Sequence, residues 1–421
     1  MPQTTAANPA PTLPTTLPTT LPTTLPTTLP TATPRPLRVA LVHDWLVTLR
    51  GGERVLDAFC ELYPDATVHT LVRRPGVATA RIEAMPHRAS MADGLPFAHS
   101  HHRWLLPLYP AAVERIELFD YDLVLSSSHC VAKAVIPGPE AVHVCYSHTP
   151  VRYAWDRRDD YLAGTSKIMA PLRPAMALAA GWLRRFDLQT LGRVDHFIAN
   201  SENTAEKIRR FYGVDPFVVP APVELHRFGS QPPSAPDGTI GRYDLVLGGL
   251  VPYKRVDVAV DAWANMPQRQ LFIVGDGPER ARLERNAPSN VTFVGRVHED
   301  DLARWYAGAT LLAFPGEEDF GIVPLEAQAA GTPVVAFDRG GARETVIDGV
   351  TGVLYAGGGV DDLVAAVARV DDLAIDPAAC RSNAGRFSRV GFMAAVSAIV
   401  DAALASNPGR RRRERLARVN Q

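Results

Sequence analysis

Short apolar runs alternate with amphipathic stretches along most of the chain. The first run, "LRVALVHDW" from Leu37, precedes "GGERVLDAFCELY", in which Val55, Leu56, Phe59 and Leu62 share one helical face. The runs "YDLVLSSSH", "AVHVCYSHTP" and "VDHFIANSENT" repeat the arrangement, each ending in small or polar residues. Strands that are apolar on both faces and separated by helices predict a parallel sheet, whose ligands gather beyond the carboxyl ends of the strands.

The alternation of strand and helix patterns is interrupted at "VVPAPVELHRF" and the loop "GSQPPSAPDGT", and then a second series of strands begins. Its strands are predicted in "YDLVLGGL", "QLFIVGDGP", "VTFVGRV", "TLLAFPGEEDFG", "TPVVAF" and "GVLYA". The fold class expected is therefore α/β, with two Rossmann-like doubly wound domains that face a central cleft.

The boundaries expected are a leader over 1–36, an N-terminal domain over 37–222 and a C-terminal domain over 223–388. A helix over 389–408, expected to pack back on the N-terminal domain, and a basic tail over 409–421 complete the chain. The leader repeats Leu-Pro-Thr-Thr without the basic and apolar regions of a signal peptide, so we expect a disordered segment.

Composition excludes several classes of function. The chain has 421 residues, with 44 Lys and Arg against 45 Asp and Glu, so its net charge gives no reason to expect a nucleic-acid partner. Its 4 cysteines lack the spacing of a zinc site or a disulfide scaffold, which favours a cytoplasmic location. The stretch "IMAPLRPAMALAAGWL" contains an arginine and is too short to span a membrane.

The segment "GEEDFGIVPLEAQ" combines features of a ligand site. A helix that begins here would present the backbone amides of Phe320, Gly321 and Ile322 to a phosphate. A carboxylate repels a phosphate but accepts hydrogen bonds from a diol, so Glu326 suits a ribose and Glu318 suits a second polyol. Together they suggest a nucleoside diphosphate sugar. Alternatively, Glu318 is a surface loop residue and Glu326 a charge favoured at a helix start.

Two other strand ends reach the same cleft. Lys254 and Arg255 follow one strand and would supply cations for a diphosphate. Gly275 and Asp276 lie in "VGDGP", where the backbone either approaches a ribose or base closely or forms an ordinary tight turn. No metal site is predicted, because the Asp-x-Asp of "DYD" opens an apolar strand.

The chain resembles the family 4 retaining glycosyltransferases, which have the GT-B fold. The resemblance rests on "VHDWLVTLRGGERVL", "CYSHTPVRYAWD", "VDHFIANSENTAEKIRRFY", "GGLVPYKRVDVAVDAW", "VGDGPER", "VTFVGRV", "FPGEEDFGIVPLEAQAAGTPVVAF" and "GGARETVIDGVTGVLY". It covers nearly the whole chain outside the leader and the tail. The order of segments is similar to the mannosyltransferase-like branch of O-antigen or exopolysaccharide assembly.

The resemblance implies roles for individual residues. Glu318 would contact the donor sugar, Glu326 the ribose and Lys254 the diphosphate, with no bound metal and no other cofactor. In the N-terminal domain it implies that Gly51 and Gly52 form the glycine-rich loop near the phosphates and that His148 lies at the reacting centre. From residue chemistry alone, a histidine at a strand end is equally compatible with a structural role.

One position departs from the family pattern. Gly249 stands five residues before Lys254, where the family usually has an arginine. One of the two cationic side chains expected to bind the diphosphate is therefore missing. Either Arg255 compensates, or the enzyme is slow, or the protein no longer binds a donor.

The function expected is transfer of a hexose, mannose favoured, from a GDP- or UDP-linked donor to a glycan or polyprenol-linked acceptor. Arg152, Tyr153 and Trp155 would contact the acceptor, or they serve only to pack a loop. The "RRRRER" tail and the segment to Arg185 suggest peripheral membrane contact, or a solvated end. A dehydrogenase is disfavoured because no Gly-x-Gly-x-x-Gly follows the first strand, while a silent nucleotide-sugar-binding protein remains the alternative.

Overall fold

The computed structural model describes residues 36–49, 51–152, 154–156, 173–228 and 243–406. The described residues from Leu37 onward form one compact unit. The expectations for the Pro/Thr-rich leader, the loop "GSQPPSAPDGT", Tyr153 and the basic tail lie outside the described residues.

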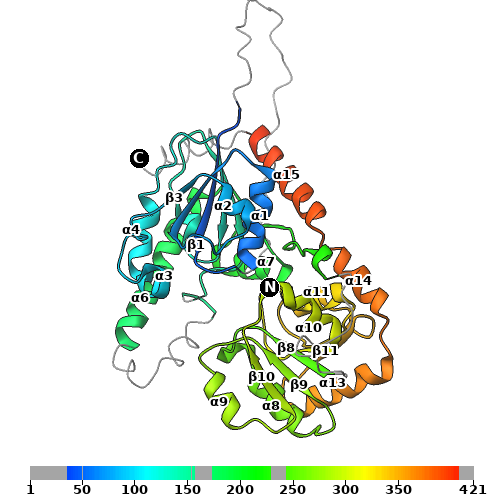
Figure 1. The fold of residues 1–421 in the computed structure, drawn as a ribbon. Coiled ribbons are helices and arrows are strands. Elements are labelled where there is room, and N and C mark those ends of the chain that lie inside the picture. The colour runs from blue at the N-terminus through cyan, green and yellow to red at the C-terminus, as the bar shows by residue number, and fades with distance from the viewer. Residues whose placement is uncertain (1–35, 50, 153, 157–172, 229–242, 407–421) are drawn as a thin grey trace, which may run out of the picture. The chain divides into compact units, whose positions relative to one another are not determined.

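A parallel sheet forms the N-terminal part of the described chain. Its seven strands run in the order β3-β2-β1-β4-β5-β6-β7 (Figure 1). The strands are β1 (Val39–Leu46), β2 (Thr67–Arg73), β3 (His87–Ala89), β4 (Leu123–Ser128), β5 (Val142–Ser147), β6 (His196–Ala199) and β7 (Phe217–Val218). Every residue of β1, β4 and β5 is buried, because helices cover both faces of the sheet.

A second parallel sheet contains six strands in the order β10-β9-β8-β11-β12-β13. Its strands are β8 (Tyr243–Leu247), β9 (Leu271–Val274), β10 (Val291–Gly295), β11 (Ala309–Phe314), β12 (Val334–Phe337) and β13 (Gly352–Tyr355). They coincide with the six runs predicted from the sequence. The expected pair of Rossmann-like parallel-sheet domains is confirmed.

Helices connect the strands on both sheets. They are α1 (Gly51–Leu62), α2 (Ala80–Ala84), α3 (Ala98–His101), α4 (Tyr109–Glu114), α6 (Arg173–Gln189), α7 (Glu202–Tyr212), α8 (Val256–Ala264), α9 (Arg280–Arg285), α10 (Leu302–Gly308), α11 (Ile322–Ala330), α12 (Ala342–Thr345), α13 (Val360–Leu373), α14 (Pro377–Gly385) and α15 (Arg389–Ala405). None of those in the described part of the chain is long and apolar enough to cross a bilayer.

The last described helix, α15, packs against the first. The ring of Phe392 stacks on that of Phe59 with centroids 5.9 Å apart, and both side chains are buried. Arg389 Nη2 lies 2.6 Å from a carboxylate oxygen of Asp57 on α1. The chain therefore crosses from the second sheet back to the helices of the first, as Figure 1 shows in red beside blue.

Candidate functional site

Lys254 and Glu318 meet beyond the carboxyl ends of neighbouring strands β8 and β11. Lys254 ends a short 3-10 helix, Pro252–Lys254, and Glu318 lies in the loop after β11. The Lys254 ammonium forms an ion pair with the Glu318 carboxylate. The loop passes so close that a Cβ on Gly316 would lie 2.6 Å from Lys254 Cα, so only glycine fits there.

Two helix N-termini come together beside this pair. Helix α11 begins at Ile322, after Gly321 with a φ of 87°, and α1 begins at Gly51. A Cβ on Gly51 would lie 3.9 Å from Ile322 Cγ2. The first amides of each helix have no partner within the helix, and both dipoles present their positive ends, so the place favours an anion. The Phe320 side chain is buried near Phe387, so only its backbone is available to a ligand.

Glu326 lies one turn into α11. Its Oε2 accepts a hydrogen bond from the Tyr306 hydroxyl at 2.8 Å. Burial raises the pKa of Glu326, although the Tyr306 hydrogen bond and the charges of Arg227 and Arg54 oppose the rise. Within the described ranges Glu326 Oε1 has no hydrogen-bond partner, and it can accept one from a hydroxyl.

The predicted turn after β9 lies against the strand end of β8. Gly275 has a φ of 138°, and a Cβ there would lie 1.9 Å from the Gly248 carbonyl oxygen, so the close approach requires glycine. Asp276 uses its Oδ1 to accept from the Gly277 amide at 2.8 Å. The turn is therefore stabilised by its own contacts, whether or not it also approaches a ligand.

Arg255 and Gly249, the candidate replacement for the family arginine and the position where that arginine is missing, lie in different surroundings. A Cβ on Gly358, in the loop after β13, would lie 2.9 Å from Arg255 Nη1, so this guanidinium lies beside Gly358. Gly249 is exposed, and a Cβ there would meet only the Asp276 carbonyl oxygen, at 4.0 Å. The position usually held by arginine in the family has room for a side chain.

His148 follows β5 and lies under the first turn of α1. A Cβ on Gly52 would lie 3.6 Å from His148 Nε2 and 3.5 Å from His43 Cε1. His148 Nε2 is 2.8 Å from the Ser127 hydroxyl. Burial, with the nearby charges of His129, His43 and Arg152, holds the pKa of His148 well below its usual value despite the opposing effect of Asp44. The predicted Gly51, Gly52 and His148 therefore lie together.

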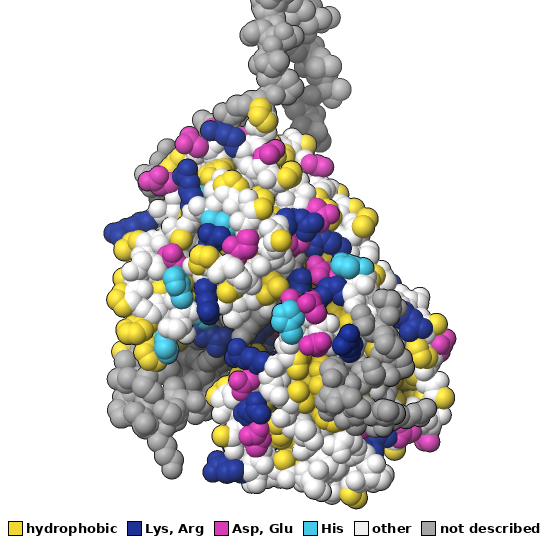
Figure 2. All heavy atoms as spheres, viewed as in Figure 1, with side chains coloured by type: hydrophobic (Ala, Val, Ile, Leu, Met, Phe, Trp, Pro, Cys, Tyr) yellow, Lys and Arg dark blue, Asp and Glu magenta, His cyan; other side chains and the backbone are white. Residues whose placement is uncertain are grey.

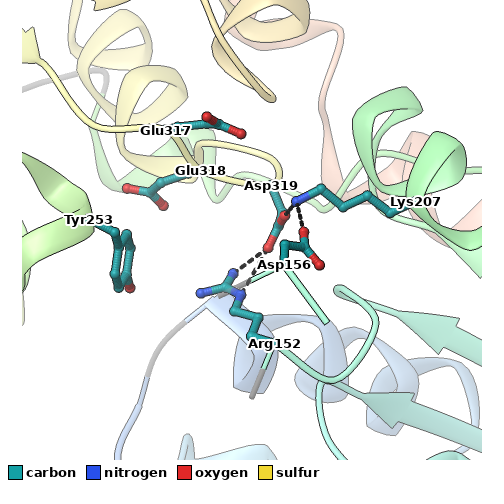
Figure 3. A pocket seen from close by; sticks show the side chains of 7 residues that line it. All are labelled: Arg152, Asp156, Lys207, Tyr253, Glu317, Glu318 and Asp319. Atoms are coloured by element: carbon teal, nitrogen blue, oxygen red, sulfur yellow. Dashed lines mark hydrogen bonds and ion pairs between the residues drawn. The ribbon is translucent and has the colours of Figure 1, made fainter. Parts of the chain in front are cut away.

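Arg152 forms an ion pair with Asp319, which lies in the loop between β11 and α11. Its Nη2 lies 2.6 Å from Asp319 Oδ2, and Lys207 Nζ lies 2.6 Å from Asp319 Oδ1 and from Asp156 Oδ2. Figure 3 shows both cations pointing at Asp319, next to Glu318. The same pocket is lined by Tyr253 and Glu317. Figure 2 shows basic side chains gathered around a hollow on the face viewed.

Trp155 is placed in packing contacts. Its ring stacks on Phe211 with centroids 4.6 Å apart, Arg184 lies over its face, and its Nε1 donates to Asp187 at 2.8 Å. Of the three residues predicted to contact an acceptor, Arg152 thus lines the pocket and Trp155 supports a loop. Tyr153 is outside the described residues.

The Asp-x-Asp segment has partners of its own, because Asp122 Oδ2 accepts from the Arg38 amide at 2.9 Å. Among the described residues, no group of three or more His, Cys, Asp or Glu side chains is arranged to hold a metal ion.

Two family descriptions match consecutive parts of the chain. "Glycosyltransferase Family 4" matches residues 49–227, and "Glycosyl transferases group 1" matches residues 242–372. The chain carries family 4-like and group 1-like glycosyltransferase domains. In the GT-B fold that these two domains adopt, the N-terminal one contains Gly51, Gly52 and His148, and the C-terminal one contains Lys254, Glu318 and Glu326.

Curated relatives and solved structures are consistent with this assignment. A D-inositol 3-phosphate glycosyltransferase of Kribbella flavida is 35% identical over 217 residues, which cover 45% of this chain and 50% of that protein. One of Mycobacterium tuberculosis is 31% identical over 273 residues, 56% of each chain. This chain therefore spans about half the length of the curated relatives it matches.

Two solved structures share the fold of the GT-B domains at low identity. The complex of Anabaena Alr3699/HepE with UDP-glucose is 19% identical with a TM-score of 0.64, covering 86% of this chain and 99% of that chain. Sucrose-phosphate synthase from Thermosynechococcus elongatus is 19% identical with a TM-score of 0.67, covering 88% and 100%.

Sequence reasoning missed several residues that the structure places at this site. They are His43, Glu53, Ser127, Lys207 and Asp319. Glu53 and Asp319 stand inside the motifs "GGER" and "GEEDFG", next to residues that were chosen, but nothing in the sequence alone shows which cations or histidines they face.

Proposed function

We propose that the protein transfers a hexosyl group from a nucleoside diphosphate sugar to a hydroxyl, with retention at the anomeric carbon. One observation carries the proposal: the N-termini of α1 and α11 lie side by side next to Lys254, with carboxylates at Glu318 and Glu326 on the same loop and helix. A diphosphate suits the cation and the helix ends, while carboxylates suit hydroxyl-bearing groups on either side.

In this proposal each group has a distinct task. Lys254 and the amides of α11 stabilise the charge that develops on the leaving phosphate, and Glu318 accepts hydrogen bonds from hydroxyls of the transferred sugar. Glu326 binds the ribose. His148, which follows β5 of the first sheet, contacts the reacting groups. The leaving phosphate acts as the base for the acceptor hydroxyl, so no protein nucleophile is required. A site closed to water would suppress hydrolysis of the donor.

The candidate donor and the candidate acceptors follow from different observations. The order of sequence segments favours mannose carried by GDP, and an acceptor that is a glycan or polyprenol-linked glycan. The curated relatives are named inositol-phosphate glycosyltransferases, which adds a phosphorylated polyol as a candidate acceptor. Arg152 and Lys207 line the pocket where such an acceptor would bind, although Asp319 neutralises part of their charge.

A screen of donors and acceptors tests the proposal. The protein is incubated with UDP- and GDP-linked hexoses and with polyprenyl-diphosphate glycans or inositol phosphate, and products are followed by mass spectrometry. We expect a mass gain of one hexose on one acceptor, with the α-linkage that retention of an α-linked donor requires. An inverted linkage would contradict the retaining mechanism.

A second candidate is a protein that binds a nucleotide sugar without transferring it. Gly249 favours this alternative, because the missing arginine would have bound the diphosphate and contributed about 1.5 to 3 kcal/mol. Tight donor binding with no transfer to any acceptor in the screen would support it.

A further inference from the structure

His148 shares one serine with a second histidine, His43. His43 and Ser127 are direct partners in the parallel pairing of β1 and β4. The Ser127 hydroxyl lies 3.1 Å from His43 Nδ1 and 2.8 Å from His148 Nε2. A hydroxyl has a single proton, so it can donate to one imidazole and must accept from the other. The protonation of the two rings is therefore linked.

Glu53 lies at the far end of this chain of contacts. Its Oε1 is 3.9 Å from His43 Nε2, and both side chains are buried. Within the described residues His43 Nε2 has no hydrogen-bond partner. Burial alone would raise the pKa of Glu53, but the interactions with His43, a backbone hydrogen bond and the charge of His129 together outweigh burial and lower the pKa, so the carboxylate is ionised near neutral pH. A lone pair on His43 Nε2 would face this negative charge, so the proton is favoured on that nitrogen.

The remaining positions of the protons follow from this one. With its proton on Nε2 and its lone pair on Nδ1, His43 accepts a hydrogen bond from the Ser127 hydroxyl. The Ser127 oxygen is then left to accept from His148, so the His148 proton is on Nε2. The depressed pKa of His148 keeps its ring neutral, with the lone pair on Nδ1. No residue in the described ranges forms a hydrogen bond to that nitrogen.

We propose that Glu53, His43 and Ser127 are positioning residues that fix His148 as the Nε2–H tautomer, with Nδ1 free to accept a hydrogen bond from a substrate hydroxyl. The substrate contact rests on the proposed function. The tautomer itself does not, because it follows from the contacts within the protein alone. Helix α1 supplies both Glu53 and Gly52, which packs over the two imidazoles, so one turn of one helix shapes and polarises this side of the site.

The test reads the tautomer directly. The full chain is labelled with ¹⁵N-histidine, and long-range ¹H–¹⁵N NMR spectra distinguish protonated from unprotonated ring nitrogens. The His148 signals are assigned by their loss in H148Q. In the wild type we expect His148 and His43 both as Nε2–H tautomers, and in S127A we expect His148 to become a mixture. A wild-type His148 protonated on Nδ1, or an unchanged tautomer in S127A, would overturn the proposal.

The adjacent residue provides a matched control. Ser126 is buried on the other face of β4, and its hydroxyl lies 2.8 Å from His143 Nε2. S126A therefore removes a Ser–His hydrogen bond of the same length from the same strand. We expect S126A to leave the His148 tautomer unchanged. A shift in S126A as large as in S127A would contradict a specific role for Ser127.

A second variant keeps the test decisive if S127A does not fold. E53Q removes the charge but retains the shape of the side chain, and we expect it to weaken the tautomer preference of both histidines. An unchanged tautomer in E53Q would contradict the proposal. With an active donor and acceptor in hand, we expect kcat to fall about 10- to 100-fold in S127A, the range for loss of one hydrogen bond to a group that carries charge, with an unchanged Kd for the nucleotide sugar. An unchanged kcat would remove the substrate contact while leaving the tautomer result intact.

Discussion

Lys254 and Glu318, one the proposed phosphate ligand and the other the proposed sugar ligand, form an ion pair with each other in the structure. A nucleoside diphosphate that binds Lys254 must therefore compete with the Glu318 carboxylate. A nucleotide sugar recovers the lost interaction by giving Glu318 hydroxyls to bind. In the proposed site, the pair thus favours the complete donor over the diphosphate product.

The first prediction concerns this competition. E318Q should bind UDP or GDP more tightly, by about fivefold or about 1 kcal/mol, because desolvation offsets most of the attraction in a largely buried ion pair and the variant removes the competing charge. The same variant should transfer sugar more slowly. Calorimetric titration measures the affinities, with E279Q, which removes the ion-pair partner of Arg282 on α9, as the control. Weaker UDP and GDP binding by E318Q would argue against competition.

The second prediction separates the phosphate from the ribose. K254A should weaken binding of a nucleoside diphosphate about 10- to 100-fold and leave the affinity for the nucleoside unchanged, because in the proposed site Lys254 contacts the phosphates and not the nucleoside. E326A should weaken the binding of both the nucleoside diphosphate and the nucleoside. Titrations with the diphosphate and the nucleoside check this, with R282A as the control for loss of a surface cation. Equal effects of the two variants on both ligands would contradict the assignment of roles.

The third prediction restores the family arginine. Gly249 is exposed and a Cβ there would meet only the Asp276 carbonyl oxygen, at 4.0 Å, so G249R should fold normally. A second cation should strengthen diphosphate binding about tenfold and raise the rate of transfer. Affinity and turnover are measured against the wild type. Binding that stays the same or weakens in G249R would show that Gly249 does not limit the site.

The fourth prediction concerns Asp319, which joins Arg152 and Lys207 to the loop of the second sheet. Burial alone would raise its pKa, but the two cations lower it to about 2. An unfolded aspartate has a pKa of about 3.9, so the stabilisation is present above about pH 4 and is lost as the pH falls to about 2. D319N should lower the free energy of unfolding by about 3 kcal/mol at pH 7.

Urea unfolding at pH 7 and at decreasing pH tests that prediction. The difference between wild type and D319N should shrink below about pH 4. D338N removes the partner of Arg343 in an exposed pair and should change the free energy of unfolding by less than about 1 kcal/mol. A difference between wild type and D319N that is independent of pH would rule out the ionised carboxylate as its source.

The fold was predictable because buried parallel strands leave a strong local signal. All six strands of the second sheet appear in the sequence as apolar runs ending in glycine, proline or polar residues. In the first sheet β2, β3 and β7 were missed. The edge strands β3 and β7 are short and only partly buried or exposed, whereas β2 is a buried strand whose apolar run is interrupted by His69 and Thr70. A strand of two or three residues carries too little periodicity to be recognised.

Placement of the site followed from the same rule, but partners did not. Parallel strands put Lys254 and Glu318 at one edge of a sheet, so their proximity could be expected. The bridge from Ser127 to His43 and His148 depends on strand order and register, which join residues 84 and 21 positions apart. Arg152 and Asp319 are 167 positions apart and belong to different sheets, so their pairing is a property of the tertiary structure alone.

For Trp155, the sequence could not distinguish a ligand-binding ring from a packing ring. Its aromatic face suits a sugar ring, and the sequence gives no reason to prefer a ligand over a neighbour. In the structure Phe211 and Arg184 occupy that face and Asp187 binds its ring nitrogen. The competition between packing and binding was decided by residues on α6 and α7 that no local pattern connects to Trp155.

The most direct test of the donor site is calorimetric titration of the wild type and E326A with UDP-hexoses and GDP-hexoses, GDP-mannose included. The proposal predicts that the wild type binds at least one of these donors with a micromolar Kd and that E326A binds it at least about tenfold more weakly. No binding by the wild type at millimolar donor would contradict the proposed function.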